Sequence, residues 1–212
     1  MSLSDVILER NHAVLDAMLT HRFVEDVCTD RLPDEVFKRY LAYEGAFVET
    51  AIAIFSFATA RAPDMAAKRW MIGVLDALAN VQVPYFEERI TTLGIKQPAI
   101  LPENARAFDQ GMLTLAKNGE FLEIVTAMFA AEWMYWTWCQ RASKLTLSNR
   151  DLAAWVALHV DDAFAEQALW LKRAIDRYAA PEDLSRLNDV FHTVTMLEIR
   201  FHDAPYEAKG VT

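Results

Sequence analysis

The stretch "LPDEVFKRYLAYEGAFVETAIAIFSFATAR", residues 32–61, decides the fold class of this 212-residue chain. Apolar side chains return through it at helical spacing, which is typical of a helix that packs on a core. Asp34 and Glu35 stand in its first turn, where acidic side chains suit the helix dipole, and Pro63 follows its end. The stretch therefore predicts one long helix that begins after Pro33.

Helical patterns also fill the rest of the chain, and no alternating run is long enough to predict a strand. We expect helices at residues 4–20, 64–93 with a kink or break at Pro84, 103–117, 120–145, about 148–178, and from 180–187 to about 203. No linker, repeat or low-complexity tract divides these blocks. The sequence predicts an all-α fold, a single domain over residues 1–212 with about seven helices.

Composition excludes several classes of protein. Hydrophobic residues make up 53% of the chain and charged residues 24%, which suits a packed core and is too apolar for disorder. The net charge of -9 and the lack of a basic cluster argue against nucleic-acid and membrane partners. The first residues lack a signal-peptide pattern, and the apolar runs are too short to span a bilayer. We expect a soluble, cytoplasmic protein.

Three of the expected helices each carry one glutamate on an apolar stripe. Glu44 falls at helical spacing among Phe37, Tyr40, Leu41, Phe47 and Ala51. Glu132 does so among Phe121, Ile124, Val125, Met128, Tyr135 and Cys139. Glu198 does so among Leu187, Phe191, Val194 and Phe201 or His202. Any one of them could lie at a stripe edge and reach water. Three together predict a polar pocket inside the bundle, where apolar surroundings raise a carboxyl pKa toward neutral pH.

The cysteines and histidines carry weaker signals. Two cysteines make neither a disulfide framework nor a metal spacing. We expect Cys139 to be a buried packing thiol and Cys28 to be a spectator in the loop-like "DVCTDRL". His202, four residues after Glu198, predicts a pair on a helix surface.

His159 is the candidate metal ligand. Asp162 and Glu166 follow it at i+3 and i+7, along one face of the expected helix. Histidines and carboxylates on facing helices build di-iron sites. A ferritin-like site needs two Glu-x-x-His pairs, however, and the sequence has only Glu9 with His12.

The segments 21–49, 117–136 and 193–208, in this order, resemble the TenA family, also called thiaminase II or aminopyrimidine aminohydrolase. The resemblance covers most of the chain. It implies a heme-oxygenase-like helical bundle, usually a homotetramer, with a pyrimidine pocket at its centre. It also implies a thiamin-salvage hydrolase that uses water to cleave the exocyclic C–N bond of an aminopyrimidine, with no metal or other cofactor.

Several family positions carry over to this chain. Glu44, in "YEGAF", replaces the acid that holds the amino group and ring nitrogen of the pyrimidine. Phe47 matches the aromatic residue three positions later. Glu198 matches the glutamate that handles protons at the reacting centre, and Tyr135 matches a tyrosine that orders the catalytic group.

Other positions depart from the family. The nucleophilic cysteine of the family falls on Ala131, and two pocket tyrosines fall on Phe108 and His159. The chain thus resembles the branch that lacks the cysteine, in which a glutamate is expected to take over. Glu132 directly follows the vacant position and is the candidate.

The expected mechanism assigns a role to each residue. The pyrimidine stacks among Phe47, Tyr135, and Phe108 or Trp136, with His159 also in the pocket, and Glu44 accepts hydrogen bonds from its edge. Glu198 and Glu132 lie over the exocyclic carbon, where one protonates the departing amine and the other activates water.

Two alternatives stay open. A heme-oxygenase-like di-metal oxidase would use Glu44, Glu132, His159 and Glu166 to activate oxygen. Against it, Ala51 and Ala163 stand where a second histidine and a further acid are expected. The other alternative is a non-catalytic bundle that binds a pyrimidine or a protein partner.

Overall fold

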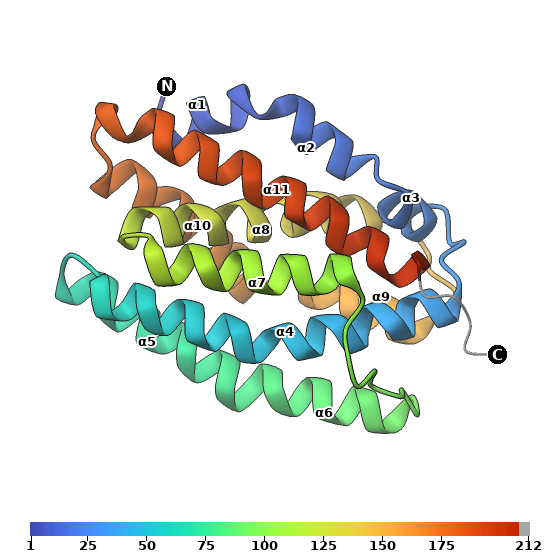
Figure 1. Ribbon diagram of the computed structural model, residues 1–212. Coiled ribbons are helices and arrows are strands. Elements are labelled where there is room, and N and C mark those ends of the chain that lie inside the picture. Colours follow the sequence, from blue (N-terminus) through green and yellow to red (C-terminus); the bar gives the residue numbers. More distant parts are fainter. Residues whose placement is uncertain (208–212) are drawn as a thin grey trace.

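The computed structural model describes residues 1–207, and Figure 1 shows them as helices joined by loops, with a long loop at residues 93–102. No strand occurs among these residues, so the all-α prediction is confirmed. The last five positions of the expected domain, 208–212, lie outside the described residues. The helices are α1 (Leu3–Arg10), α2 (His12–Leu19), α3 (Arg22–Cys28), α4 (Asp34–Arg61), α5 (Met65–Ala77), the π turn η1 (Leu78–Gln82), α6 (Val83–Thr92), α7 (Glu103–Asn118), α8 (Phe121–Ala142), α9 (Arg150–Leu158), α10 (Asp162–Tyr178), the 3-10 turn η2 (Pro181–Asp183) and α11 (Leu184–Glu207).

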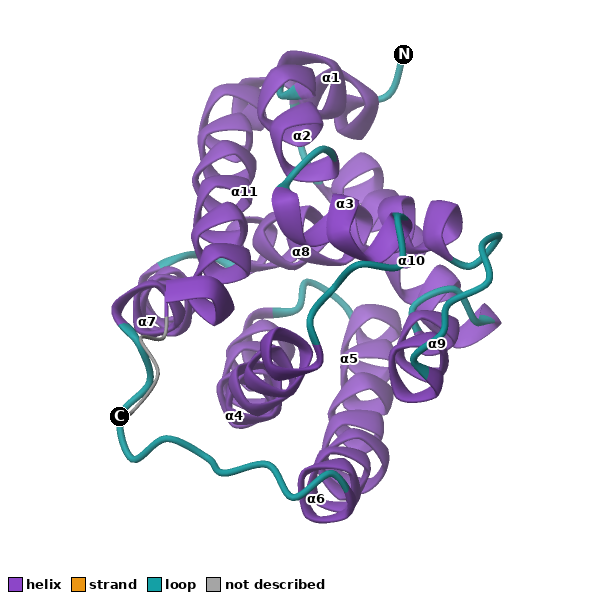
Figure 2. Cartoon of the chain, turned by 90° about the vertical axis from the view of Figure 1, so that its right-hand side faces the viewer, coloured by secondary structure: helices purple, strands orange, loops and turns teal. Residues whose placement is uncertain are grey.

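Helix α4 is the central helix of the bundle. It contacts α5, α6, α7, α8 and α11, and Figure 2 shows it nearly end-on with α5, α7 and α8 arranged around it. By length and composition alone α4 could cross a membrane. Its packing explains that composition, because a helix in contact with several neighbours carries apolar residues on more than one face. Large side chains such as Tyr40, Ile54 and Phe55 are fully buried along it.

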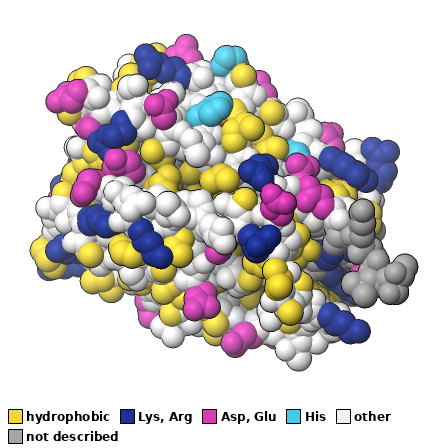
Figure 3. Space-filling model, viewed as in Figure 1, with side chains coloured by type: hydrophobic (Ala, Val, Ile, Leu, Met, Phe, Trp, Pro, Cys, Tyr) yellow, Lys and Arg dark blue, Asp and Glu magenta, His cyan; other side chains and the backbone are white. Residues whose placement is uncertain are grey.

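Charged side chains are interspersed on the face shown in Figure 3, where Lys and Arg alternate with Asp and Glu. A mixed surface of this kind neutralises itself over short distances and presents no field of a single sign.

Two predicted boundaries near the N-terminus are wrong. The expected helix 4–20 is divided at Asn11, which is buried and whose side-chain Nδ2 donates to Ile7 O and to Asn188 Oδ1, both at 2.9 Å. Of the loop-like stretch "DVCTDRL", residues 26–28 form the end of α3, which begins at Arg22, whereas residues 29–32 lie outside helices, as expected. That helix begins with His21, whose Nδ1 accepts from Phe23 N at 3.1 Å. A histidine cap is not among the common start signals.

The expected helix 148–178 is also divided. Helix α9 ends at Leu158, and α10 begins at Asp162 with Asp161 as its cap, which accepts from Phe164 N at 2.7 Å. His159 therefore does not share a helical face with Asp162 and Glu166, and the predicted i+3 and i+7 pattern is wrong. The capping bond of Asp161 explains the new start, because aspartate is a favoured N-cap residue.

Pro84 produces a π turn rather than a break. Helices α5 and α6 are continuous through η1, where Val83 N donates to Leu78 O. Pro84 has no N–H and cannot donate to the carbonyl four residues earlier, so a wider turn accommodates the ring. The turn brings Leu78, Val81 and Gln82 to the cavity described below.

Candidate active site

A cavity of about 310 Å³ lies inside the bundle. Its walls come from α4, α7, α8 and α11, from the end of α5, η1 and α6, and from α9, α10 and the connection between them. This volume is at the lower end of the range for small-molecule sites. The lining is mainly apolar and aromatic, with a few acids.

Glu44, Glu132 and Glu198 all line this cavity, although they come from α4, α8 and α11. Glu198 is 1% exposed and Glu132 is 8% exposed. The packing of these three helices therefore brings together three carboxylates that lie far apart in the sequence. Phe47, Phe108, Tyr135 and His159 line the same cavity.

The carboxylate of Glu44 is held by groups from α9. Trp155 Nε1 donates to Glu44 Oε2 at 2.7 Å, and His159 Nε2 lies 3.6 Å from Glu44 Oε1. The Nδ1–H of His159 donates to Trp155 O at 2.9 Å, which orients the ring and directs Nε2 toward the acid. Glu44 is thus fixed in place and keeps lone pairs that can accept from a ligand.

Glu132 has one oxygen bound and one without a partner. Gln167 Nε2 donates to Glu132 Oε1 at 2.5 Å, whereas the buried Oε2 has no hydrogen-bond partner in residues 1–207. Burial raises the pKa of Glu132 to about 7, against the opposing effects of the Gln167 hydrogen bond and of His159. A carboxyl group with this pKa can exchange a proton at neutral pH.

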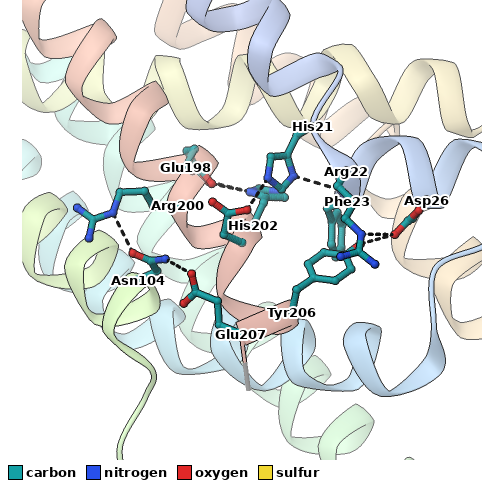
Figure 4. A network of polar contacts seen from close by, with 11 residues as sticks. His21, Arg22, Phe23, Asp26, Asn104, Glu198, Arg200, His202, Tyr206 and Glu207 are labelled. Atoms are coloured by element: carbon teal, nitrogen blue, oxygen red, sulfur yellow. Dashed lines mark hydrogen bonds and ion pairs between the residues drawn. The ribbon is translucent and has the colours of Figure 1, made fainter. Parts of the chain in front are cut away.

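Glu198 has no hydrogen-bond partner on either oxygen within the described part of the chain. Burial, followed by the charges of Glu44 and Glu132, raises its pKa well above the usual value. Figure 4 shows Glu198 beside His202, whose Nδ1 lies 3.7 Å from Glu198 Oε2 and donates to Glu198 O at 2.8 Å. Burial lowers the pKa of His202 to about 3, so this contact is not an ion pair. The expected surface pair is wrong, because His202 is fully buried.

Tyr135 joins the cavity to a second buried tyrosine. Its hydroxyl lies 2.6 Å from that of Tyr40. Burial, followed by the charges of Glu198 and Glu44, raises the pKa of Tyr135 well above its usual range, so the hydroxyl keeps its proton. The aromatic wall continues through Phe47 and Phe108, whose ring centroids are 4.7 Å apart.

Ala131 and Trp136 both belong to α8 but face different surroundings. Ala131 lines the cavity, whereas Trp136 does not. Trp136 follows Tyr135 by one residue, a step that turns the side chain about 100° round the helix. It packs on Trp133 instead, with ring centroids 5.2 Å apart. The expectation that Trp136 stacks on a pyrimidine is corrected by this geometry.

Neither cysteine lines the cavity. Cys139 is fully buried, and burial raises the pKa of its thiol well above the usual value. A thiol in this state is a poor nucleophile. Cys28 Sγ accepts from Arg141 Nε at 3.2 Å on a different part of the molecule.

The ligands expected for a di-metal site do not converge. Glu44, Glu132 and His159 line the cavity, but Glu166 is exposed and pairs with Arg173 outside it. Within residues 1–207, no group of three or more His, Cys, Asp or Glu side chains is arranged to hold a metal ion. Glu166 belongs to α10, which begins at Asp162, and not to a continuation of α9.

Three groups around the acids were not predicted from the sequence. Trp155 holds Glu44, Gln167 holds Glu132, and the hydroxyl of Tyr40 meets that of Tyr135. Each pair joins residues from different helices. Only Trp155 carried a signal, since it stands four residues before His159 and can share its face of the chain.

The chain belongs to the TENA/THI-4/PQQC family, because the model of that family matches residues 10–208. It is 22% identical to an aminopyrimidine aminohydrolase from Halalkalibacterium halodurans over 99% of this chain and 97% of that protein. It is also similar to the structure of a TenA homologue from P. horikoshii, with a TM-score of 0.89, 17% identity and coverage of 99% and 100%.

A domain with a heme oxygenase-like fold from Shewanella denitrificans is similar as well, with a TM-score of 0.78, 11% identity and coverage of 98% and 93%. The predicted family and the predicted heme-oxygenase-like fold are therefore confirmed.

Proposed function

We propose that this member of the TENA/THI-4/PQQC family is a thiamin-salvage hydrolase that cleaves the exocyclic C–N bond of an aminopyrimidine by carboxylate acid–base catalysis. The observation that carries the proposal is that Glu44, Glu132 and Glu198 line one aromatic cavity. The 22% identical aminopyrimidine aminohydrolase supports the same class of substrate.

In this proposal the pyrimidine ring lies between the aromatic rings of Phe47, Phe108 and Tyr135. Glu44 accepts a hydrogen bond from the ring amino group, and such bonds are strong because the acceptor is charged. Trp155 and His159 keep the Glu44 carboxylate oriented before the substrate arrives. This preorganisation lowers the cost of ordering the site on binding.

Glu198 and Glu132 then divide the proton transfers. Glu198, with its raised pKa, is the group that gives a proton to the amine as the C–N bond breaks and the electron pair leaves with nitrogen. The oxygen of a water molecule bonds to the exocyclic carbon, and Glu132 takes the released proton. The products are a hydroxymethylpyrimidine and the free amine.

Ala131 supports direct attack by water. The family's nucleophilic cysteine falls on this position, and the methyl group of Ala131 lines the cavity. Cys139 is buried elsewhere and cannot form a covalent intermediate there. A carboxylate that activates water is therefore the base that the cavity offers.

Replacement of Glu198 by Gln tests the proposal. We expect ammonia release from an aminomethylpyrimidine to fall by about 10²- to 10⁴-fold, the usual worth of one positioned acid or base. Glu166→Gln is the matched control, because Glu166 is exposed outside the cavity, and it should keep the wild-type rate.

Other outcomes of this assay separate the alternatives. Unchanged turnover in Glu198→Gln contradicts the assigned role. Binding of the pyrimidine without ammonia release by the wild type supports a non-catalytic bundle. Activity that depends on added iron or manganese, and that Glu166→Gln abolishes, supports the di-metal oxidase.

A further inference from the structure

Two tyrosine hydroxyl groups meet at the wall of the cavity. Tyr40 on α4 and Tyr135 on α8 bring their hydroxyl oxygens to 2.6 Å, a hydrogen-bonding distance. Neither hydroxyl has another hydrogen-bond partner in residues 1–207. Burial, followed by the charge of a neighbouring glutamate, raises the pKa of each tyrosine well above its usual range, so both hydroxyls keep their protons. The pair therefore has two protons, of which one lies between the two oxygens.

The other proton points away from the pair, and the surroundings decide which tyrosine carries it. Tyr40 is fully buried and does not line the cavity. Its ring is enclosed by other rings with centroids 4.5–5.7 Å away, those of Phe23, Trp155, Phe201 and His202. The buried Nε2 of His202 has no hydrogen-bond partner within the described part of the chain, so Tyr40 does not donate to it. A second proton on Tyr40 would lack an acceptor, which is costly for a buried donor.

We propose that Tyr40 is a positioning residue, which donates a hydrogen bond to the Tyr135 oxygen and so directs the Tyr135 proton into the cavity. Tyr135 lines the cavity, where its O–H can donate to a bound molecule. A hydroxyl that accepts one hydrogen bond is polarised and donates a stronger one. Tyr40 thus acts on the contents of the cavity through Tyr135, without reaching them itself.

This inference rests on the proposed function for the identity of the group that accepts from Tyr135, which is the attacking water. Tyr135 follows Glu132 by three residues on α8, so the two side chains are neighbours on one face of the helix. A water between them can accept from the Tyr135 hydroxyl and donate to Glu132 Oε2, which has no partner among residues 1–207. The water keeps one lone pair for the exocyclic carbon.

The proposed reaction balances with this water in place. Its oxygen bonds to the exocyclic carbon as one of its protons passes to Glu132. The C–N bond breaks, and its electron pair leaves with nitrogen, which takes the proton of Glu198. Tyr135 keeps its own proton throughout and only holds the water in line.

Tyr40→Phe tests the inference, because it removes one oxygen and keeps the ring. We expect kcat for an aminomethylpyrimidine to fall about tenfold with KM within about threefold, since the water is held less well while the aromatic wall remains. Tyr43→Phe is the matched control. Tyr43 is a buried tyrosine of the same helix that does not line the cavity, and its variant should keep the wild-type rate.

A double-mutant cycle separates this role from a structural one. If Tyr40 acts through Tyr135, Tyr40→Phe should lower kcat about tenfold in the wild type and less than about twofold in Tyr135→Phe. Loss of packing alone would lower kcat by the same factor in both backgrounds. Additive effects, or an unchanged kcat in Tyr40→Phe, overturn the inference.

Neutron diffraction from deuterated wild-type crystals locates the hydroxyl deuterons without any variant, so the inference can be decided even if a variant fails to fold. We expect the Tyr40 deuteron between the two oxygens and the Tyr135 deuteron in the cavity. A Tyr135 deuteron between the oxygens, or a Tyr40 deuteron directed toward His202, contradicts the inference.

The two measurements also distinguish this inference from the proposed function. Deuterons in the expected positions, in a protein that does not hydrolyse an aminomethylpyrimidine, contradict the proposed function and support the direction of the hydrogen bond. Hydrolysis with the opposite direction supports the proposed function and contradicts the role of Tyr40.

Discussion

At the scale of single residues, the neighbours Ala131 and Glu132 define the chemistry of the cavity. Both line it, one with a methyl group and the other with a carboxyl group whose pKa burial raises to about 7. The first removes the option of a thiol nucleophile at that position, and the second supplies a group that titrates at neutral pH. The proton transfer that Glu132 can perform therefore depends on its buried environment, which sets its pKa.

Gln167 influences the pKa of Glu132, and we predict that replacing Gln167 by Leu changes the pH dependence of kcat/KM. The Gln167 hydrogen bond lowers the pKa of Glu132, so its loss should raise that pKa further above neutral. A base works when it is deprotonated, and the acidic limb of the kcat/KM profile should therefore move to higher pH. Gln140→Leu, an exposed change at the other end of α8, should leave the profile in place. An unmoved profile in Gln167→Leu contradicts the role of Glu132 as base.

The raised pKa of Glu132 also predicts how folding stability depends on pH. Its pKa rises from 4.5 to about 7 on folding, so the folded state binds more protons in this window and loses stability as pH increases through it. At pH 8 the buried charge should cost up to about 3 kcal/mol that Glu132→Gln does not incur. Urea unfolding should show that the free energy of unfolding decreases less from pH 5 to pH 8 in the variant than in the wild type. A decrease of the same size in both contradicts this pKa.

At the scale of elements, the π turn η1 shapes one wall of the cavity. Leu78, Val81 and Gln82 come from this turn, and Tyr85 follows it in α6. A π turn adds one residue to a helix and changes the direction of the side chains that follow. Pro84 makes the turn necessary, since its ring cannot fit against the preceding helical turn.

Pro84→Ala should therefore change substrate binding more than chemistry. The new N–H allows an ordinary α turn, which would rotate the lining residues after it by up to about 100°. We expect a higher KM with kcat within about threefold, since the three carboxylates lie on other helices. Pro98→Ala, in the α6–α7 connection, is the control. Steady-state kinetics with an aminomethylpyrimidine will test this, and an unchanged KM is the contrary result.

At the scale of the whole molecule, we predict that copies of the chain meet where two apolar side chains of α5 are exposed. Met65 and Ile72 are 58% and 54% exposed and stand seven residues apart, on the same side of the helix. The homotetramer implied by the family resemblance stays a prediction, as does the cytoplasmic location.

Ile72→Glu should weaken that assembly, because a charge at the centre of an apolar contact is desolvated without a partner. Light scattering after size exclusion should show a lower mass for the variant than for the wild type. Leu145→Glu, an exposed change in the α8–α9 connection, should keep the wild-type mass. A monomeric wild type contradicts the expected tetramer.

The helical class, most of the helices and the inward direction of three glutamates can be predicted from the sequence alone. Apolar periodicity carries this information, because it reports how each side chain faces relative to its own helix. The helix boundaries that periodicity predicts wrongly have local physical causes. Buried Asn11 and the capping bond of Asp161 end helices that periodicity alone would continue.

Which side chains meet in the cavity cannot be predicted from the sequence and requires the folded chain. The convergence of Glu44, Glu132 and Glu198 and the support from Trp155 and Gln167 depend on how separate helices cross. Crossing geometry results from the packing of whole surfaces, and no local pattern encodes it. The unpartnered oxygens of Glu132 and Glu198 likewise became visible only when every neighbouring group was in place, because a missing hydrogen bond is a property of the assembled cavity.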